Sequence, residues 1–168
     1  VAATGGTFTT EAFTAAGGAT GANVDNTMSV TAKIGGKDVT FTTAELADNT
    51  SAADWATALG NAEAEIDGKT VKLSEYFGVT QNAGAFTFTD KTTGKEGSGN
   101  TISGITVAGT GKGSFADTTI TKADGKDAYK TGTSGYVNAG TEAVIMAGKP
   151  AVDQLASTTL TLTADDLK

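Results

Sequence analysis

The pattern of hydrophobic and polar positions over residues 27–43 predicts a β-hairpin. Apolar side chains alternate with Ser, Thr or Lys at Met28, Val30, Ala32 and Ile34. This period of two is that of a strand with one buried face. Gly35-Gly36 follows, and a pair of glycines suits a two-residue turn that needs positive φ angles. We therefore expect residues 38–43 to return as the partner strand.

Residues 51–66 have a different period and predict the one main helix of the chain. Apolar residues fall on one face at helical spacing, at Trp55, Ala58, Leu59, Ala62 and Ile66. Ser51 is placed to cap the N-terminus, and Asp54 follows three residues later, where an acid can reach back to the cap. We expect Asp67-Gly68 to end the helix, with Gly68 as the C-terminal cap.

Most of the remaining chain is rich in Thr and Gly, and β-branched Thr favours extended structure. The expected strands are residues 6–13, 70–73, 85–89, 101–108, 115–122, 142–147 and 158–163. Between them we expect a turn-rich segment at 90–100, a loop or irregular hairpin at 124–140, and one or two helical turns at 151–156. The predicted fold class is α+β, mainly antiparallel β with one main helix and Thr/Gly-rich β subdomains.

The charge balance argues against several partners. All 12 basic residues are Lys, scattered among 19 acids, for a net charge of -7 in 168 residues. A nucleic-acid surface needs clustered cations, and an anionic membrane would repel this chain. The sequence contains no apolar run of about 18 residues, which a membrane-spanning helix would need, and no export signal follows Val1. We expect a processed protein or a fragment of a longer one.

The chain contains neither His nor Cys. Their absence removes the usual general base at neutral pH, the Ser-His and Cys-His nucleophile pairs, and nearly all zinc and copper sites. It also removes disulfides. We therefore expect no enzyme, no cofactor and no metal, with carboxylates as the only remaining chemistry.

Two pairs of acids are candidates for carboxylate catalysis, Glu63 with Glu65 and Asp165 with Asp166. A glycosidase needs two acids about 5–10 Å apart in a cleft. Residues i and i+2 on the predicted helix do not face each other, so solvated surface acids are the favoured interpretation.

Two loops resemble ligand-binding loops in part. Asp124-Gly125-Lys126-Asp127 has oxygen ligands suited to calcium but lacks the further acids of the twelve-residue loop, so a plain turn is the alternative. The run from Gly109 to Ser114 suggests a phosphate loop, but Gly113 separates Lys112 from Ser114 and the spacing is wrong, so we interpret it as a linker. Thr occupies 32 positions, which suits either O-linked glycans or simple β propensity, and we favour the latter.

Four segments carry a resemblance to a known family. They are Ile34-Gly35-Gly36-Lys37-Asp38-Val39, Ser51-Ala52-Ala53-Asp54-Trp55-Ala56-Thr57-Ala58-Leu59, Gly78-Val79-Thr80, and Gly84-Ala85-Phe86-Thr87-Phe88-Thr89 followed by Gly94. Together they resemble the hook-IN motif of bacterial flagellins and filament-capping proteins, over about half of the chain. The chain departs from the motif at Gly60-Asn61, where Ile-Asn is usual, and by roughly ten extra residues from Glu65 to Glu75.

The resemblance implies the outward-facing variable domain of a flagellin, a structural, shielding and antigenic module at the bacterial surface. It implies a hook-IN-like ββαββ subdomain at residues 25–108, and a β-rich subdomain at 1–24 plus 109–168 that brings the termini close together. The implied partners are other flagellin subunits, through parts absent from this chain, and host receptors or antibodies. A domain of a surface-layer protein or adhesin is the alternative, and a carbohydrate-active enzyme is the third class.

Overall fold

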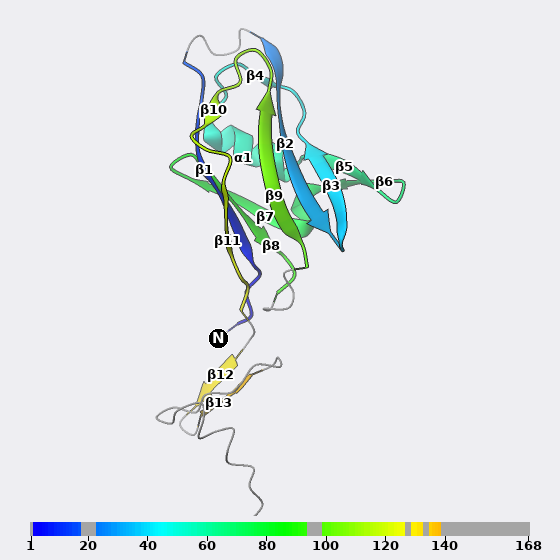
Figure 1. The fold of residues 1–168 in the computed structure, drawn as a ribbon, viewed down its shortest axis with the longest axis vertical. Helices are drawn as coiled ribbons and strands as arrows, with labels where there is room; N and C mark the ends of the chain where they lie inside the picture. The colour runs from blue at the N-terminus through cyan, green and yellow to red at the C-terminus, as the bar shows by residue number, and fades with distance from the viewer. Residues whose placement is uncertain (1, 18–22, 94–98, 127–128, 133–134, 139–168) are drawn as a thin grey trace, which may run out of the picture. The chain divides into compact units, whose positions relative to one another are not determined.

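The computed structural model describes residues 2–17, 23–93, 99–126, 129–132 and 135–138. The chain divides into two compact units, Thr4–Lys126, and Val1–Ala3 with Asp127–Lys168 (Figure 1). In the second unit, β12 (Tyr129–Gly132) and β13 (Gly135–Asn138) form an antiparallel hairpin. The strands expected at 142–147 and 158–163, and the helical turns at 151–156, lie outside the described residues.

The first sheet of the Thr4–Lys126 unit, here the β1 sheet, has the strand order β10-β1-β8-β7, with β11 also pairing with β1. All of its pairs are antiparallel. Its strands are β1 (Thr7–Thr14), β7 (Phe77–Asn82), β8 (Ala85–Asp90), β10 (Ser114–Phe115) and β11 (Ile120–Ala123).

The second sheet, here the β2 sheet, has β2 between β9 on one side and β3 and β4 on the other, and β5 and β6 continue from β3. It is also antiparallel throughout. Its strands are β2 (Val24–Ile34), β3 (Lys37–Thr42), β4 (Leu46–Ala47), β5 (Glu63–Ile66), β6 (Lys69–Lys72) and β9 (Thr101–Ala108).

The core lies between the two sheets, which Figure 1 shows as separate layers with α1 behind β2 and β9 in that view. Alternate residues of the strands fill it, as the period of two predicts. The largest fully buried side chains include Trp55, Phe8, Phe41, Phe77, Phe86, Phe88 and Met28. Trp55 on α1 meets Phe13 on β1 edge to face, with ring centroids 6.2 Å apart. The predicted class, mainly antiparallel β with one main helix, is confirmed.

The main helix, α1 (Ala52–Gly60), is shorter than the predicted 51–66. Its start is as expected, because the Ser51 side chain accepts a hydrogen bond from the Asp54 N–H. Its end is not. Asn61 caps it, and the chain then turns into β5. A second helix, α2 (Leu73–Tyr76), is a single turn.

The prediction that Asp67-Gly68 caps a helix is wrong. These residues form the two-residue turn between β5 and β6, with φ angles of 50° and 78°. Both angles are positive, as a type I′ hairpin turn requires, and Asp-Gly is one of the favoured pairs for it. Ile66 therefore belongs to a strand and not to the apolar face of α1.

Two buried threonine hydroxyls accept backbone N–H groups where the strand pairing is irregular. Between Thr9 and Ala12 the register of β1 against β8 shifts, and the Thr10 hydroxyl accepts the Phe86 N–H at 3.0 Å. Where β3 gives way to β4, the Thr43 hydroxyl accepts the Met28 N–H at 3.0 Å. Buried backbone donors need partners, so these hydroxyls take the place of missing carbonyls.

The division into units differs from the expected one at residues 25–108. The β1 strand, expected in the β-rich subdomain at 1–24 plus 109–168, pairs along Thr7–Thr9 with β8, expected in the subdomain at 25–108. Residues 109–126 also continue into the β1 sheet through β10 and β11. The glycine-rich segment at 109–113 therefore joins two sheets of one unit and does not separate two subdomains.

Candidate functional site

The acids Glu63 and Glu65 lie on β5 and not on a helix, which corrects the reason for setting them aside. Alternate residues of a strand point to the same face, so these two carboxylates are neighbours. Both are exposed on a two-stranded hairpin, and Glu63 is directly opposite Lys72. The hairpin lies at the side of the β2 sheet (Figure 1), where water solvates both acids. Asp165 and Asp166 lie outside the described residues.

The loop expected as a turn or calcium site ends the Thr4–Lys126 unit. Asp124 is exposed and forms an ion pair with Lys122 at 3.0 Å, while Gly125 is buried. The side chain of Asp127 is outside the described residues. Over the part of the chain that the structure describes, no three or more Asp or Glu side chains gather as a metal site would require.

The glycine-rich segment is a structured loop held by two carboxylates, which we call the clasp and define as Asp25 and Asp48. Asp25 accepts hydrogen bonds from the N–H of Thr110 at 3.3 Å and from its hydroxyl. The backbone N–H of Gly111 faces the Asp48 carboxylate and helps to lower its pKa. The N–H groups of Thr110 and Gly111 already face carboxylates, which would repel a phosphate there. The phosphate-loop interpretation therefore has no support here.

Asp48 is the more heavily bonded member of the clasp. Its carboxylate accepts the Asn26 side-chain amide at 2.8 Å, and the backbone and side-chain N–H groups of Asn23 at 3.1 and 3.0 Å. These bonds favour the ionised form, so they hold the pKa of Asp48 below its usual value. The Asn26 bond has the largest effect, and burial partly opposes it.

Two glycines of the loop are fixed by close approach to this cluster. A Cβ on Gly111 would lie 2.3 Å from Asp48 Oδ1, and one on Gly109 would lie 2.2 Å from Asn26 Oδ1. That Asn26 oxygen is buried without a hydrogen-bond partner, and the Gly109 backbone covers it. Any larger residue at either position would push the loop off the clasp.

A second buried acid lies at the end of β8. Asp90 is 1% exposed, and its Oδ1 accepts the Thr92 N–H at 2.9 Å and the Asn100 amide at 3.1 Å. Its Oδ2 is buried without a partner. The amide oxygen of Asn100 in turn accepts the N–H of Gly35, at the β2–β3 turn. Asp90 therefore ties three turns together and presents no oxygen to solvent.

Hydroxyl groups cover the outer face of the β1 sheet. Four threonines from four neighbouring strands lie in one line across it, here the threonine row, Thr121, Thr9, Thr87 and Thr80. Thr9 and Thr87 hydrogen-bond each other through their hydroxyls at 3.1 Å. Cross-strand Thr pairs of this kind stabilise a sheet by roughly 0.2–1 kcal/mol each. The abundance of Thr thus has a structural use on this face.

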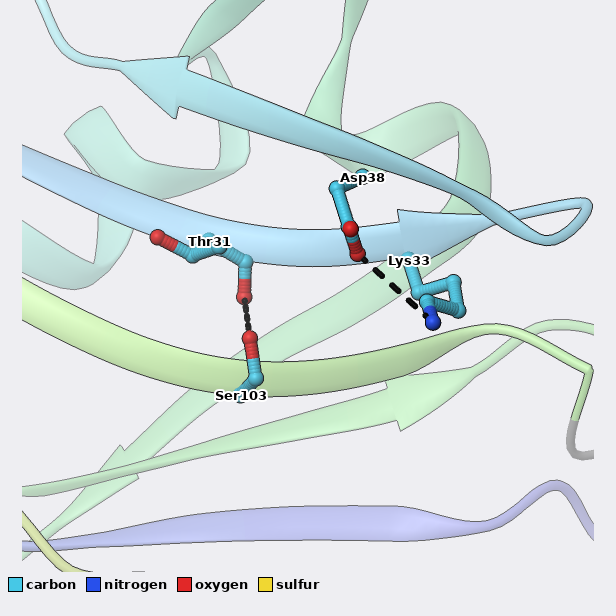
Figure 2. A network of polar contacts seen from close by, with 4 residues as sticks. All are labelled: Thr31, Lys33, Asp38 and Ser103. Atoms are coloured by element: carbon cyan, nitrogen blue, oxygen red, sulfur yellow. Dashed lines mark hydrogen bonds and ion pairs between the residues drawn. The ribbon is translucent and has the colours of Figure 1, made fainter.

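The outer face of the β2 sheet carries polar contacts as well. Figure 2 shows Ser103 on β9 reaching Thr31 on β2, with its hydroxyl donating to the Thr31 carbonyl at 3.3 Å. The same view shows Lys33 and Asp38, an exposed cross-strand ion pair at 3.8 Å. Ser103 sits where the register of β9 against β2 shifts, so its side chain bridges a bulge.

The two ends of the Thr4–Lys126 unit meet. The Thr4 N–H donates to the Lys126 carbonyl at 2.8 Å, and the Lys126 N–H donates to the Thr4 carbonyl at 2.9 Å. This is an antiparallel pair between residues that lie at opposite ends of the unit's sequence. The chain therefore enters and leaves the unit at one place.

Comparison of the chain with protein-family models, with curated proteins and with solved structures finds no match. Among the residues described, no helix has the length and apolar character needed to cross a membrane.

Local sequence patterns do not indicate the clasp, the Thr10 and Thr43 hydroxyl contacts or the joined ends. Asp25 and Thr110 are 85 residues apart, and Thr10 and Phe86 are 76 apart, so no local spacing signals either contact. The one available signal was the cluster of glycines near 109–113, which marks close backbone approach as readily as it marks a linker.

Proposed function

We propose that this chain is the surface-exposed variable domain of a flagellin-like filament protein, with a structural, shielding and antigenic role and no catalysis. The observation that carries the proposal is the Thr4–Lys126 pair. A domain inserted into a longer chain needs adjacent ends, so that its host continues undisturbed.

The hook-IN resemblance supports the same function. Its four segments correspond to the β2–β3 turn, α1, β7 and β8, all within the Thr4–Lys126 unit. The extra residues from Glu65 to Glu75 correspond to the end of β5, the β5–β6 turn, β6 and most of α2. Most of this insertion is an exposed hairpin, and only its last part, at Leu73, enters the core. Variable surface domains tolerate insertions in exposed hairpins.

In this role the module acts through its position and its surface. Helical arms belonging to other parts of the parent protein would polymerise, and the module would project from the filament. Its partners would be neighbouring flagellin subunits, through those arms, and host receptors or antibodies at the exposed faces. Its location would be extracellular, on the flagellum.

Immunogold electron microscopy with antibodies raised against this chain tests the proposal, on cells that produce the parent protein. The expected result is gold along the full length of flagellar filaments. Labelling of a cell-wall lattice, with unlabelled filaments, would instead establish the surface-layer or adhesin alternative. A strain lacking the parent gene is the control for antibody specificity.

A further inference from the structure

Residues 114–126, here the strap, form the outermost strand of the β1 sheet. They run antiparallel to β1 along one edge, through β10, β11 and the Thr4–Lys126 pair. The opposite edge of β1 is bonded to β8. The strap can therefore leave without breaking any hydrogen bond between β1 and β8.

Few side chains hold the strap to the core. Phe115 and Ile120 are half-buried, Gly125 is buried, and its other ten residues are exposed. The Phe115 ring contacts Phe13 and Phe86, with centroids 5.3 and 5.9 Å apart. On the opposite edge, Phe86 and Phe88 of β8 are fully buried. Segments with few buried apolar contacts open locally before the whole domain unfolds, so the strap is the weaker edge.

The ends of the strap favour opening. At one end the clasp holds Thr110, and Gly113, which has a positive φ of 72°, lies between the clasp and the strap, so the chain can turn at Gly113 while the clasp stays bonded. At the other end the Thr4–Lys126 pair is the last hydrogen-bonded pair before the chain leaves the unit. Separation can begin there and proceed one pair at a time toward Phe115, because β1 and the strap are antiparallel.

The edge that the strap vacates would select its occupant by chemistry. It presents the backbone N–H and C=O groups of Thr7–Thr10, which pair with any extended segment. It also requires an aromatic ring at the Phe115 position, and an aliphatic side chain five residues later at the Ile120 position. The strap of a second copy meets these requirements by definition.

We propose that the free edge of β1 is a strand-binding site, and that two copies of this chain exchange straps to form a dimer. Each strap in the dimer makes with its partner the contacts that it makes in the monomer. The exchange costs little enthalpy and is controlled by concentration, since a tethered strap has an effective concentration on the order of millimolar. The inference does not depend on the proposed filament role.

Single-cysteine chains test the exchange, because the natural chain has no Cys to interfere. Thr9 and Thr121 are register partners between β1 and β11, so chains with Thr9→Cys are mixed with chains carrying Thr121→Cys at about 1 mM. The matched control mixes Thr80→Cys with Thr87→Cys chains, from the same threonine row but within the β7–β8 hairpin. Both mixtures are oxidised and separated on non-reducing gels, and the mixed disulfide is identified by mass.

The expected result is at least about tenfold more mixed disulfide for the strap pair than for the hairpin pair, with a yield that rises with protein concentration. Equal yields for the two mixtures would overturn the proposal. Hydrogen exchange of the unmodified chain gives an independent test. Strap amides should exchange at least about tenfold faster than those of Phe86 and Phe88, and equal rates would show that the strap opens only with global unfolding.

Discussion

Replacing Thr10 by Val removes a single buried hydroxyl and keeps the shape of the side chain. Thr10 is 4% exposed, and its hydroxyl accepts the N–H of Phe86 at 3.0 Å and donates to the Glu11 carbonyl at 2.8 Å. In the variant, the Phe86 N–H has no acceptor in the bulge and no route to water. Leaving a buried donor unsatisfied costs about 1–3 kcal/mol, so Thr10→Val should lower the free energy of unfolding by about 2 kcal/mol. For a unit of this size, the midpoint temperature should fall by roughly 6–10 °C.

Urea unfolding followed by Trp fluorescence measures this change directly, because Trp55 is the one Trp and is buried. Thr7→Val on the outer face of the same strand is the matched control, and it should change stability by less than about 0.5 kcal/mol. Thr10→Ser, which keeps the hydroxyl, should lie between the two. If Thr10→Val unfolds at the same urea concentration as Thr7→Val, the hydroxyl does not repair the bulge and the reasoning fails.

Three further changes test the packing, the turn and the clasp. Trp55→Ala should lower the free energy of unfolding by about 3–5 kcal/mol, because Trp55 is 1% exposed, and circular dichroism in urea should detect it. Gly84→Ala should lower the free energy of unfolding by more than about 1 kcal/mol in the same assay, because the φ of Gly84 is +87° and the added Cβ would lie 2.6 Å from the Phe13 carbonyl oxygen. Gly17→Ala, with open space around the added Cβ, is the neutral control. The folded-state pKa of Asp48 lies below its unfolded value. Its contribution to the free energy of unfolding is therefore present above about pH 4 and is lost as pH falls through the folded pKa. Asp48→Asn should flatten the pH dependence of the unfolding midpoint, and an unchanged profile would contradict this.

The strands of the Thr4–Lys126 unit were largely predictable from local patterns. Residues 27–34 alternate cleanly and are followed by Gly35-Gly36, and the structure has β2 before this turn and β3 after it. The start of α1 was equally predictable from Ser51 and Asp54. These features depend on neighbours within a few residues, so short-range sequence carries the information.

The end of α1 shows where local patterns mislead. Ala62 and Ile66 continue the helical spacing, yet Ala62 is buried beyond the helix and Ile66 lies on β5. Glu63 to Ile66 also alternates polar with apolar, and Asp67-Gly68 then marks a hairpin. Both periods fit the same residues. The choice depends on pairing with Lys69–Lys72, which a helical interpretation does not consider.

The clasp and the joined ends were out of reach for another reason. Each depends on strands that meet only after both sheets have formed. The hydrophobic periodicity of a strand does not indicate which other strands become its neighbours. Thr4 and Lys126 have ordinary local sequence, and only the fold brings their backbones together. The helical reason for setting Glu63 and Glu65 aside was wrong in the same way, since the face that these two exposed acids share depends on their being in a strand.

The hydroxyls of Thr10 and Thr43 also bear on how this fold changes over generations. An inserted residue normally shifts a strand out of register and leaves a backbone N–H without an acceptor, and selection removes such variants. Thr10 shows that a threonine hydroxyl can accept such an N–H, and the chain has 32 threonines. The fold can therefore absorb single insertions and deletions inside its sheets, and descendants can diverge in length as well as in side chains.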